Sequence, residues 1–359
     1  MRVLIVHPGV PIYGGAEMVI VQLVRYLKRM GIGHSYLTTG LPAGMREALG
    51  DTSILISRNR TGTRLNEMAA LWRGVHACLG QYDVLNAHNF PAHLALFPAR
   101  QPAVWMCNEP PEMFSSLVRK PVEALGRFVA RNYIRYTVVS DESNARAFEA
   151  IYHFRPEIIH YGVDYEFFAA GGGRRDREKF TILQVGTLTP YKNQMASLRA
   201  VAELADSIPN IRLVLAGWGQ PDYVASLKRY IAERGMEARV VLAGSLNREQ
   251  VREWYQASDM LLHPIGPQGG WLTPFEALCA GVPVVVSREF NAAYLVQREN
   301  LGVVTDDYRQ AIWDIYQDRA KYAGVAARGK AWVREHLGWD EYCRRMVALF
   351  SRAMEAQHD

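Results

Sequence analysis

The sequence predicts an α/β protein built from two doubly wound halves, each a parallel sheet covered by helices. Short apolar, β-branched runs alternate with helical patterns along most of the chain, and that alternation is typical of a parallel sheet covered by helices. The alternation stops at a glycine-rich, charged stretch, residues 169–179, and then begins again. The length of 359 residues suits two domains better than one.

The first half opens with an apolar run at residues 2–6, bounded by His7-Pro8-Gly9. A glycine-containing loop follows, and then a helical pattern that ends near Gly31. This order of strand, loop and helix predicts the start of a βαβ unit. We expect further strands at residues 34–39, 52–57, 82–87, 103–107, 136–140 and 157–162.

The second half follows a linker, AAGGGRRDREK, that has no apolar periodicity. We expect strands at 180–186, 211–217, 239–244, 260–265 and 282–287, and helices at 193–205, 224–234, 248–256, 274–280, 308–317 and 339–356. The expected domains are 1–168 and 180–335, joined by the linker 169–179 and followed by a terminal segment, 336–359. Ligands of such sheets bind beyond the carboxyl ends of the strands, so we expect a cleft site between the two halves.

Composition excludes several classes of protein. With 49% apolar and 21% charged residues, the chain is neither disordered nor collagen-like. Its four cysteines form no CxxC pair, which argues against a disulfide scaffold or structural zinc and favours a reducing compartment. The first apolar run is too short for a signal peptide, and no run is long enough to span a membrane. We expect a cytoplasmic protein, and leave peripheral contact with the inner face of the membrane open.

The formal charge of +5 favours anionic partners without choosing among them. Zinc-finger spacing and an aromatic–basic RNA-binding pattern are both absent from the sequence, so nucleic acid is not an expected partner.

The most informative segment is QGGWLTPFEALCAGVPVVVS, residues 268–287. We expect Thr273 to cap a helix that starts at Pro274 and ends at Gly281. The unpaired amides and the positive dipole end of that helix would form an anion pocket. Glu276 lies in the first turn, and its carboxylate could accept two hydrogen bonds from a diol such as a ribose. The alternative is an ordinary capped helix in which Glu276 only complements the dipole.

A second strand–turn–helix segment is VGTLTPYKN, residues 185–193. Lys192 lies just before the expected helix and could place its ammonium group on a phosphate. The alternative is a solvated turn lysine. A third glycine loop, YGGAE at residues 13–17, also opens a helix but is not GxGxxG, so the dinucleotide fingerprint is absent.

Polar residues also follow two strands of the first half. His88 lies at the end of the strand 82–87, where a catalytic or binding group would lie, although a structural histidine is the alternative. CNEPP, residues 107–111, follows the next strand and either lines an acceptor pocket or turns the chain. Taken together, the glycine-bearing helix starts, the lysine and the carboxylate describe a cleft for a diphosphate with a sugar at each end.

An ordered set of motifs carries a family resemblance: GGAE, YDVLNAH, IIHYGVD, VGTLTPYKN, LVLAGWG, VVLAGSLNREQV, WLTPFEALCAGVPVVVS and the late Trp339-Asp340. On these motifs, nearly the whole chain resembles the retaining glycosyltransferases of family 4. The resemblance implies the GT-B fold, two Rossmann-like domains facing each other across a cleft, with a terminal helix that crosses back to the first. It also implies a UDP- or GDP-sugar donor, a glycan or lipid-linked acceptor hydroxyl, and no cofactor or metal.

The same resemblance assigns roles to individual residues. Glu276 matches the glutamate that holds the ribose hydroxyls, Lys192 matches the lysine that binds the donor diphosphate, and His88 matches a histidine near the reacting carbon of the sugar. These three are the candidate catalytic residues. The further candidate donor-binding positions are Gly14, Gly15, Thr187, Ser245, Leu246, Gln268, Gly269, Gly270, Trp271, Leu272 and Thr273; among them, Ser245 and Leu246 match the turn that contacts the base.

The chain departs from the family pattern at four places. Gln268 replaces the first glutamate of E-x7-E, Thr187 replaces an arginine, Gly270-Trp271 inverts an aromatic–glycine order, and residues 287–291 replace a glycine–glycine turn. The nucleotide half of the expected site is therefore better supported than the sugar half. We find no glycosidase-like carboxylate pair and no DxD-type motif in the sequence, so we expect metal-independent, front-face transfer with retention, as the family implies.

Three further interpretations stay open. The basic, apolar-faced segment 118–136 could rest on anionic lipid or could be a core-facing helix with a solvated side. A nucleotide-sugar 2-epimerase would share the two-domain architecture. A catalytically silent GT-B module is the alternative that is not an enzyme.

Overall fold

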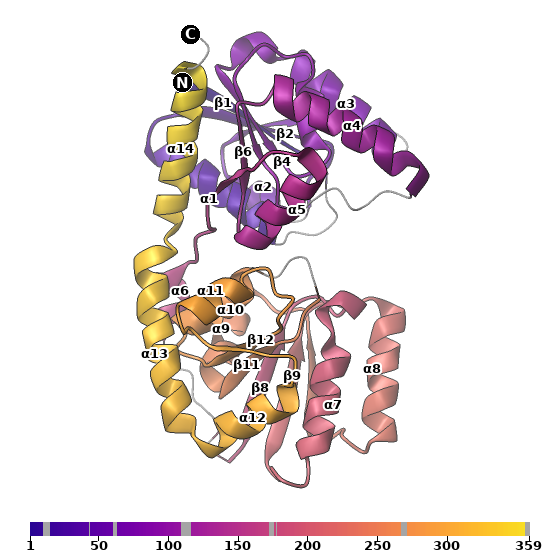
Figure 1. Cartoon of the computed structure of the whole chain (residues 1–359), viewed down its shortest axis with the longest axis vertical. Coiled ribbons are helices and arrows are strands. Elements are labelled where there is room, and N and C mark those ends of the chain that lie inside the picture. The colour runs from indigo at the N-terminus through magenta and orange to yellow at the C-terminus, as the bar shows by residue number, and fades with distance from the viewer. Residues whose placement is uncertain are drawn as a thin grey trace. The chain divides into compact units, whose positions relative to one another are not determined.

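The computed structural model describes residues 1–9, 15–42, 44–59, 63–108, 116–171, 176, 178–266 and 271–355. The chain forms two compact units (Figure 1): unit 1 is Met1–Gly162 with Trp339–Asp359, and unit 2 is Val163–Gly338. Each unit contains one wholly parallel sheet, which confirms the predicted pair of α/β halves.

Unit 1 contains a seven-stranded sheet in the order β3-β2-β1-β4-β5-β6-β7. Five of the six residues of β1 are buried, because strands of a parallel sheet are covered on both faces and form nearly continuous apolar runs. The strands are β1 (Arg2–His7), β2 (Gly33–Thr38), β3 (Ser53–Ile56), β4 (Val84–His88), β5 (Ala103–Met106), β6 (Tyr136–Val139) and β7 (Glu157–Ile158). The helices are α1 (Gly15–Arg29), α2 (Met45–Leu49), α3 (Arg64–His76), α4 (Ser116–Asn132), α5 (Glu142–Tyr152) and α14 (Trp339–Glu355).

The strand order of unit 1 reverses between β1 and β4. The chain adds β2 on one side of β1 and later places β4 on the other side of β1. Ligands of doubly wound sheets bind at the carboxyl ends of the strands at such a reversal. His7 ends β1 and His88 ends β4. The fold therefore brings two histidines to the carboxyl edge of the first sheet at its reversal.

Unit 2 repeats this plan with six strands in the order β10-β9-β8-β11-β12-β13. Its reversal lies between β8 and β11. The strands are β8 (Phe180–Val185), β9 (Ile211–Ala216), β10 (Val240–Gly244), β11 (Met260–His263), β12 (Val284–Val286) and β13 (Val303–Val304). The helices are α6 (Tyr165–Ala169), α7 (Gln194–Leu204), α8 (Pro221–Glu233), α9 (Arg248–Ala257), α10 (Leu272–Cys279), α11 (Ala293–Arg298), α12 (Tyr308–Gln317) and α13 (Arg319–His336).

Helix α13 is absent from the expectations above because it has no broad apolar stripe. Its buried residues are Ala326, Gly329 and Val333. A Cβ placed at Gly329 would lie 2.7 Å from Leu278 Cδ2 on α10, so α13 packs through small residues at close range. Small residues give a weak hydrophobic signal, so the sequence does not predict this helix.

The chain passes between the units at two adjacent points. The Val163 amide donates to the Leu337 carbonyl at 2.7 Å, and a Cβ placed at Gly162 would lie 2.4 Å from Trp339 Cα. The first passage lies ahead of the linker expected at 169–179. After the second passage, α14 returns to unit 1 and buries Tyr342, Met346 and Phe350 there.

Candidate functional site

A row of glycines marks the carboxyl edge of the second sheet. Strands β8 and β9 are followed by Gly186 (φ 145°) and Gly217 (φ 151°), and β10 ends at Gly244 (φ 69°). A Cβ placed at Gly217 would lie 2.0 Å from the Gly186 carbonyl oxygen, so these two turns pack backbone against backbone. Such an edge lets a ligand approach the main chain closely.

Lys192 lies at this edge, in the 3₁₀ turn Pro190–Lys192 just before α7. The lysine is 7% exposed, and a Cβ placed at Gly186 would lie 3.6 Å from Lys192 Cε. Gln184 donates to the Lys192 carbonyl at 2.7 Å and accepts from the Ser197 hydroxyl at 2.7 Å. A buried amide thus fixes the turn, and Lys192 is not a solvated turn side chain.

Three other predicted positions follow strands of the same sheet. The Thr187 carbonyl accepts from the Gln194 side chain at 3.0 Å, which ties the turn after β8 to α7. Ser245 is exposed and Leu246 is half-buried. Both lie between β10 and Asn247, whose side chain caps α9 together with Gln250.

Glu276 lies on α10, but this helix begins at Leu272 and not at Pro274. Thr273 is therefore a helical residue, and the prediction that it caps the helix was wrong. Trp271 already has helical dihedral angles (φ −56°, ψ −41°), so the helix extends back past the threonine. Pro274 remains in the first turn, where a missing amide hydrogen costs little. The helix is followed by Gly281 at φ 74°, as predicted.

Glu276 is half-buried. Burial raises its pKa to about 7, while the Tyr255 hydroxyl and the Arg248 cation act in the opposite direction. Tyr255 donates to Glu276 Oε2 at 3.0 Å. Asp164 also raises this pKa, but its carboxylate pairs with Arg248 at 2.9 Å.

An aromatic cluster lies beneath the start of α10. Ring centres are 4.6 Å apart for Trp271 and Phe275, 6.5 Å for Phe275 and Phe290, and 5.3 Å for Phe290 and His263. Phe290 is 2% exposed and belongs to the segment 287–291 that departs from the family pattern. That segment therefore supplies a buried ring under α10 where the family has a glycine turn.

Four predicted positions, Gly14, Gln268, Gly269 and Gly270, lie outside the described residues. Gly15 begins α1 in unit 1 and is exposed.

His88 is fully buried at the end of β4. Its Nε2 lies 2.8 Å from Asn86 Oδ1, while Asn86 Nδ2 donates to the Val104 carbonyl at 3.1 Å. Because the amide oxygen can only accept, Nε2 carries the imidazole proton. Nδ1 is then an acceptor, and it has no hydrogen-bond partner among the described residues. Burial lowers the pKa of His88 to about 3, with a smaller effect from His7, so the ring is neutral.

His7 forms the other half of this edge. Its Nδ1 lies 3.1 Å from the Tyr36 hydroxyl, and the Asn89 side chain donates to Nε2 at 3.3 Å. Burial lowers the pKa of His7 to about 3. The contact of 3.7 Å between His7 and Glu17 is therefore not an ion pair at neutral pH.

Sequence reasoning missed Tyr255, Asn86 and His7. His7 ends β1, a signal that could have singled it out, and Asn86 is a polar residue in the middle of the buried strand β4. Tyr255 meets Glu276 only through the packing of two helices, so the sequence carries no signal for it.

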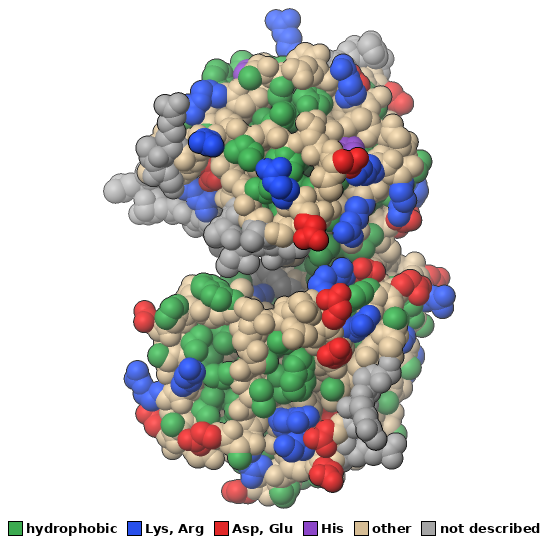
Figure 2. All heavy atoms as spheres, turned by 180° about the vertical axis from the view of Figure 1, so that it is seen from behind, with side chains coloured by type: hydrophobic (Ala, Val, Ile, Leu, Met, Phe, Trp, Pro, Cys, Tyr) green, Lys and Arg blue, Asp and Glu red, His purple; other side chains and the backbone are tan. Residues whose placement is uncertain are grey.

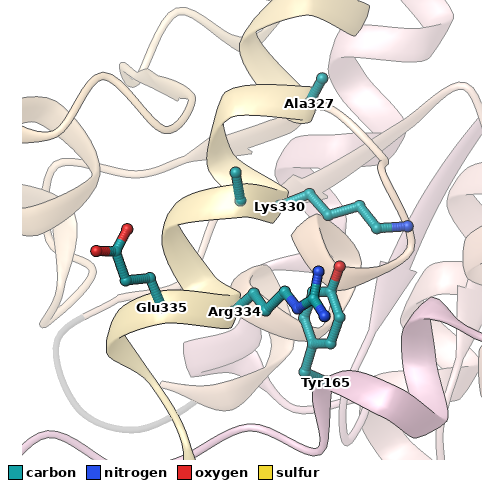
Figure 3. Close-up of a pocket in the computed structure, with 6 residues that line it drawn as sticks. Tyr165, Ala327, Lys330, Arg334 and Glu335 are labelled. Carbon is teal, nitrogen blue, oxygen red and sulfur yellow. The ribbon is translucent and has the colours of Figure 1, made fainter.

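Unit 2 also contains a cavity of about 600 Å³ that holds none of the predicted site residues (Figure 3). The Arg334 guanidinium lies 5.5 Å from the centre of the Tyr165 ring, and the Lys330 side chain points away from the backbone of α13 beside them. The lining residues are Tyr165, Ala327, Lys330, Ala331, Arg334 and Glu335.

Among the described residues, no group of three or more His, Cys, Asp or Glu side chains could hold a metal ion, and no helix has the length and apolarity to cross a membrane. On the face shown in Figure 2, basic and acidic side chains are interspersed.

Comparison with known proteins gives matches in both halves. Residues 13–167 match the model of Glycosyltransferase Family 4, and residues 170–323 match that of Glycosyl transferases group 1. A GDP-mannose-dependent alpha-(1-6)-phosphatidylinositol monomannoside mannosyltransferase of Mycolicibacterium smegmatis is 26% identical over 216 residues, 55% of this chain and 56% of that protein. A D-inositol 3-phosphate glycosyltransferase of the same organism is 25% identical over 65% of this chain and 56% of that protein. The matched region thus spans little more than half the length of these relatives.

Solved structures resemble the chain over almost its full length. Anabaena Alr3699/HepE in complex with UDP has a TM-score of 0.83 at 20% identity, covering 98% of this chain and all of that one. WaaG, a glycosyltransferase involved in lipopolysaccharide biosynthesis, has a TM-score of 0.68 at 17% identity, covering 99% of this chain and 98% of that one. At these identities the likeness concerns the fold.

Proposed function

The chain belongs to glycosyltransferase family 4, and on that premise we propose that it moves a sugar from a nucleoside-diphosphate sugar to an acceptor hydroxyl with retention of configuration. The observation that carries the proposal is the edge of the second sheet, where a buried lysine follows β8 and a half-buried carboxylate lies in α10. A cation suits a diphosphate, and a carboxylate suits a diol.

In the proposed donor site, Lys192 and the first amides of α10 hold the diphosphate, and Glu276 accepts from the ribose hydroxyls. Negative charge grows on the diphosphate as the sugar leaves, so fixed positive groups lower the barrier. These groups suffice without a metal ion. The departing phosphate oxygen takes the proton of the acceptor hydroxyl as the new glycosidic bond forms on the same face of the sugar.

The base of the donor is a uracil or a guanine, bound near Ser245 and Leu246. Each choice has support among similar proteins: one relative is named for GDP-mannose, and a structural neighbour is described in complex with UDP-glucose. His88 is proposed to contact the transferred sugar through Nδ1, which accepts a hydrogen bond from a sugar hydroxyl.

The proposed acceptor is a glycan or a lipid-linked sugar, reached at the membrane surface. On α4, Leu125 and Phe128 are 42% and 48% exposed, and the Phe97 ring lies 5.9 Å from that of Phe128. The guanidinium groups of Arg127 and Arg131 on the same helix donate hydrogen bonds to backbone carbonyls at the end of α5. The apolar residues would therefore make the contact with lipid, with the basic side chains beside them.

The membrane contact can be tested by flotation with phosphatidylglycerol vesicles. Phe128→Ser should reduce the bound fraction severalfold, while Leu65→Ser, at a residue that is 68% exposed on α3, serves as the matched control. Equal binding of wild type and Phe128→Ser would contradict the proposed contact.

Incubation with a panel of UDP- and GDP-sugars, with product analysis, separates the proposal from its two alternatives. Transfer or slow donor hydrolysis supports a glycosyltransferase. Conversion of the donor into its 2-epimer would identify an epimerase, and binding without any turnover would identify a silent module. Calorimetry with UDP and GDP should show Glu276→Ala weakening nucleotide binding severalfold in a folded protein; unchanged affinity would remove Glu276 from the site.

A further inference from the structure

We infer that Tyr255 is a positioning residue of the donor site, whose buried hydroxyl keeps Glu276 in the ionised form that accepts hydrogen bonds from a ribose. This inference rests on the proposed donor site and adds a residue that none of the sequence motifs assigns.

The hydrogen bond joins two helices. Tyr255 belongs to α9 and is completely buried, with its ring 5.7 Å from that of Phe168. Its hydroxyl has one proton and two acceptors within reach, Glu276 Oε2 at 3.0 Å and the Thr273 carbonyl at 3.4 Å. The shorter distance and the negative charge both direct the proton to Glu276. A buried hydroxyl cannot turn to water, so this bond is fixed.

The other charged groups around Glu276 interact with residues other than its carboxylate. Arg248, at the start of α9, pairs with Asp164 at 2.9 Å and lies 4.3 Å from the centre of the Phe167 ring. On the far side of α10, burial raises the pKa of Cys279 and the Lys330 cation of α13 acts to lower it. Within the described part of the chain, Tyr255 is therefore the only hydrogen-bond donor to the Glu276 carboxylate.

The hydrogen bond from Tyr255 acts on a carboxyl group whose pKa lies near neutral pH. Burial raises the pKa of Glu276 to about 7, and the Tyr255 hydrogen bond lowers it. Without the hydroxyl the pKa would rise further, so a smaller fraction of Glu276 would be ionised at pH 7. The pKa of Tyr255 itself is raised well above its ordinary value by burial, so the phenol stays a donor throughout the working range.

The experiment measures the affinity for UDP and GDP by calorimetry between pH 6 and pH 9 in the full chain. We expect Tyr255→Phe to weaken binding about tenfold at and below pH 7, because one hydrogen bond to a charged group is lost. The ratio of its dissociation constant to that of the wild type should approach one by about pH 9. Ionisation of the nucleotide phosphates affects both proteins equally and cancels in the ratio.

Two controls complete the design. Tyr342→Phe removes another buried hydroxyl, one without a hydrogen-bond partner among the described residues, and should leave binding unchanged at every pH. In the Glu276→Gln background, Tyr255→Phe should cause no further loss, since the group on which it acts has gone.

The outcomes distinguish the inference from the proposed function. A ratio that is constant with pH, or a loss that persists in the Glu276→Gln background, would show that Tyr255 acts only through packing and would overturn the inference. If Glu276→Gln itself binds both nucleotides as the wild type does, the proposed donor site fails, and the inference fails with it.

Discussion

Replacement of Gly217 by alanine tests the glycine row at the edge of the second sheet. The new Cβ would lie 2.0 Å from the Gly186 carbonyl oxygen, whereas real Cβ contacts are essentially never below 3.0 Å. The two turns must therefore separate by about 1 Å, and the turn after β8 leads directly to Thr187 and Lys192. The residue also has φ 151°, which a side chain tolerates poorly.

Both effects have a magnitude. A non-glycine residue at such a backbone conformation costs about 1–3 kcal/mol of stability, and a displacement of about 1 Å in a binding site can reduce turnover about a hundredfold. We expect Gly217→Ala to lower the free energy of unfolding by about 2 kcal/mol or more and to weaken nucleoside-diphosphate binding at least tenfold.

The matched control is Gly235→Ala, after α8. Gly235 has φ 60°, and a Cβ there would meet nothing within 4 Å, so this variant carries backbone strain without a clash. Urea unfolding followed by calorimetry with UDP and GDP compares the two variants. If Gly217→Ala binds nucleotide as tightly as Gly235→Ala does, the glycine row does not position the diphosphate site and the reasoning is refuted.

Four further outcomes are expected. The folded-state pKa of Glu276, about 7, exceeds its ordinary value of 4.5, so Glu276 contributes stability below pH 4.5 that is lost as the pH rises to 7. Relative to Glu276→Gln, the free energy of unfolding of the wild type should fall by up to about 3 kcal/mol between pH 4.5 and pH 8, as measured in urea titrations. A difference between the two proteins that stays constant with pH would contradict the burial of this group. A chelator should leave turnover nearly unchanged, whereas abolition with rescue by Mn²⁺ or Mg²⁺ would refute metal independence. His88→Ala should lower turnover far more than affinity for free nucleoside diphosphate, and equal losses would place His88 elsewhere. Gln268→Glu should change the ranking of donors at unchanged nucleotide affinity, but a wild type inert with every donor, together with a variant that transfers a neutral hexose, would favour the silent module.

The sequence predicted the sheets well because their strands are covered on both faces. Runs such as RVLIVH and FTILQV are mostly apolar and almost wholly buried, and this signal does not depend on distant contacts. It weakens where elements are short: β13 has two residues and was not predicted. The sequence predicted that α10 starts at Pro274 because Thr273 is a favourable capping residue, whereas the backbone is already helical at Trp271.

The sequence predicted only those site residues whose position follows from the order of strands and helices along the chain. Lys192 and His88 could be placed because His88 ends a strand and Lys192 lies in the turn after one, and strand ends gather at one edge of a parallel sheet. The ionisation of Glu276 could not be predicted, because it depends on Tyr255, which α9 brings into contact across a helix interface. The neutral state and the tautomer of His88 likewise depend on burial and on the side-chain orientation of Asn86.

The return of α14 to unit 1 determines the order in which the protein can fold during synthesis. Domains generally fold as they emerge from the ribosome, the earlier ones first. Unit 2 is encoded without interruption and can complete its core while translation continues. Unit 1 begins first but must wait for Tyr342, Met346 and Phe350, which leave the ribosome after the whole of unit 2. The first half of the nascent chain therefore completes its core after unit 2 does, and chains that stall before residue 339 should be the preferred substrates of chaperones and proteases.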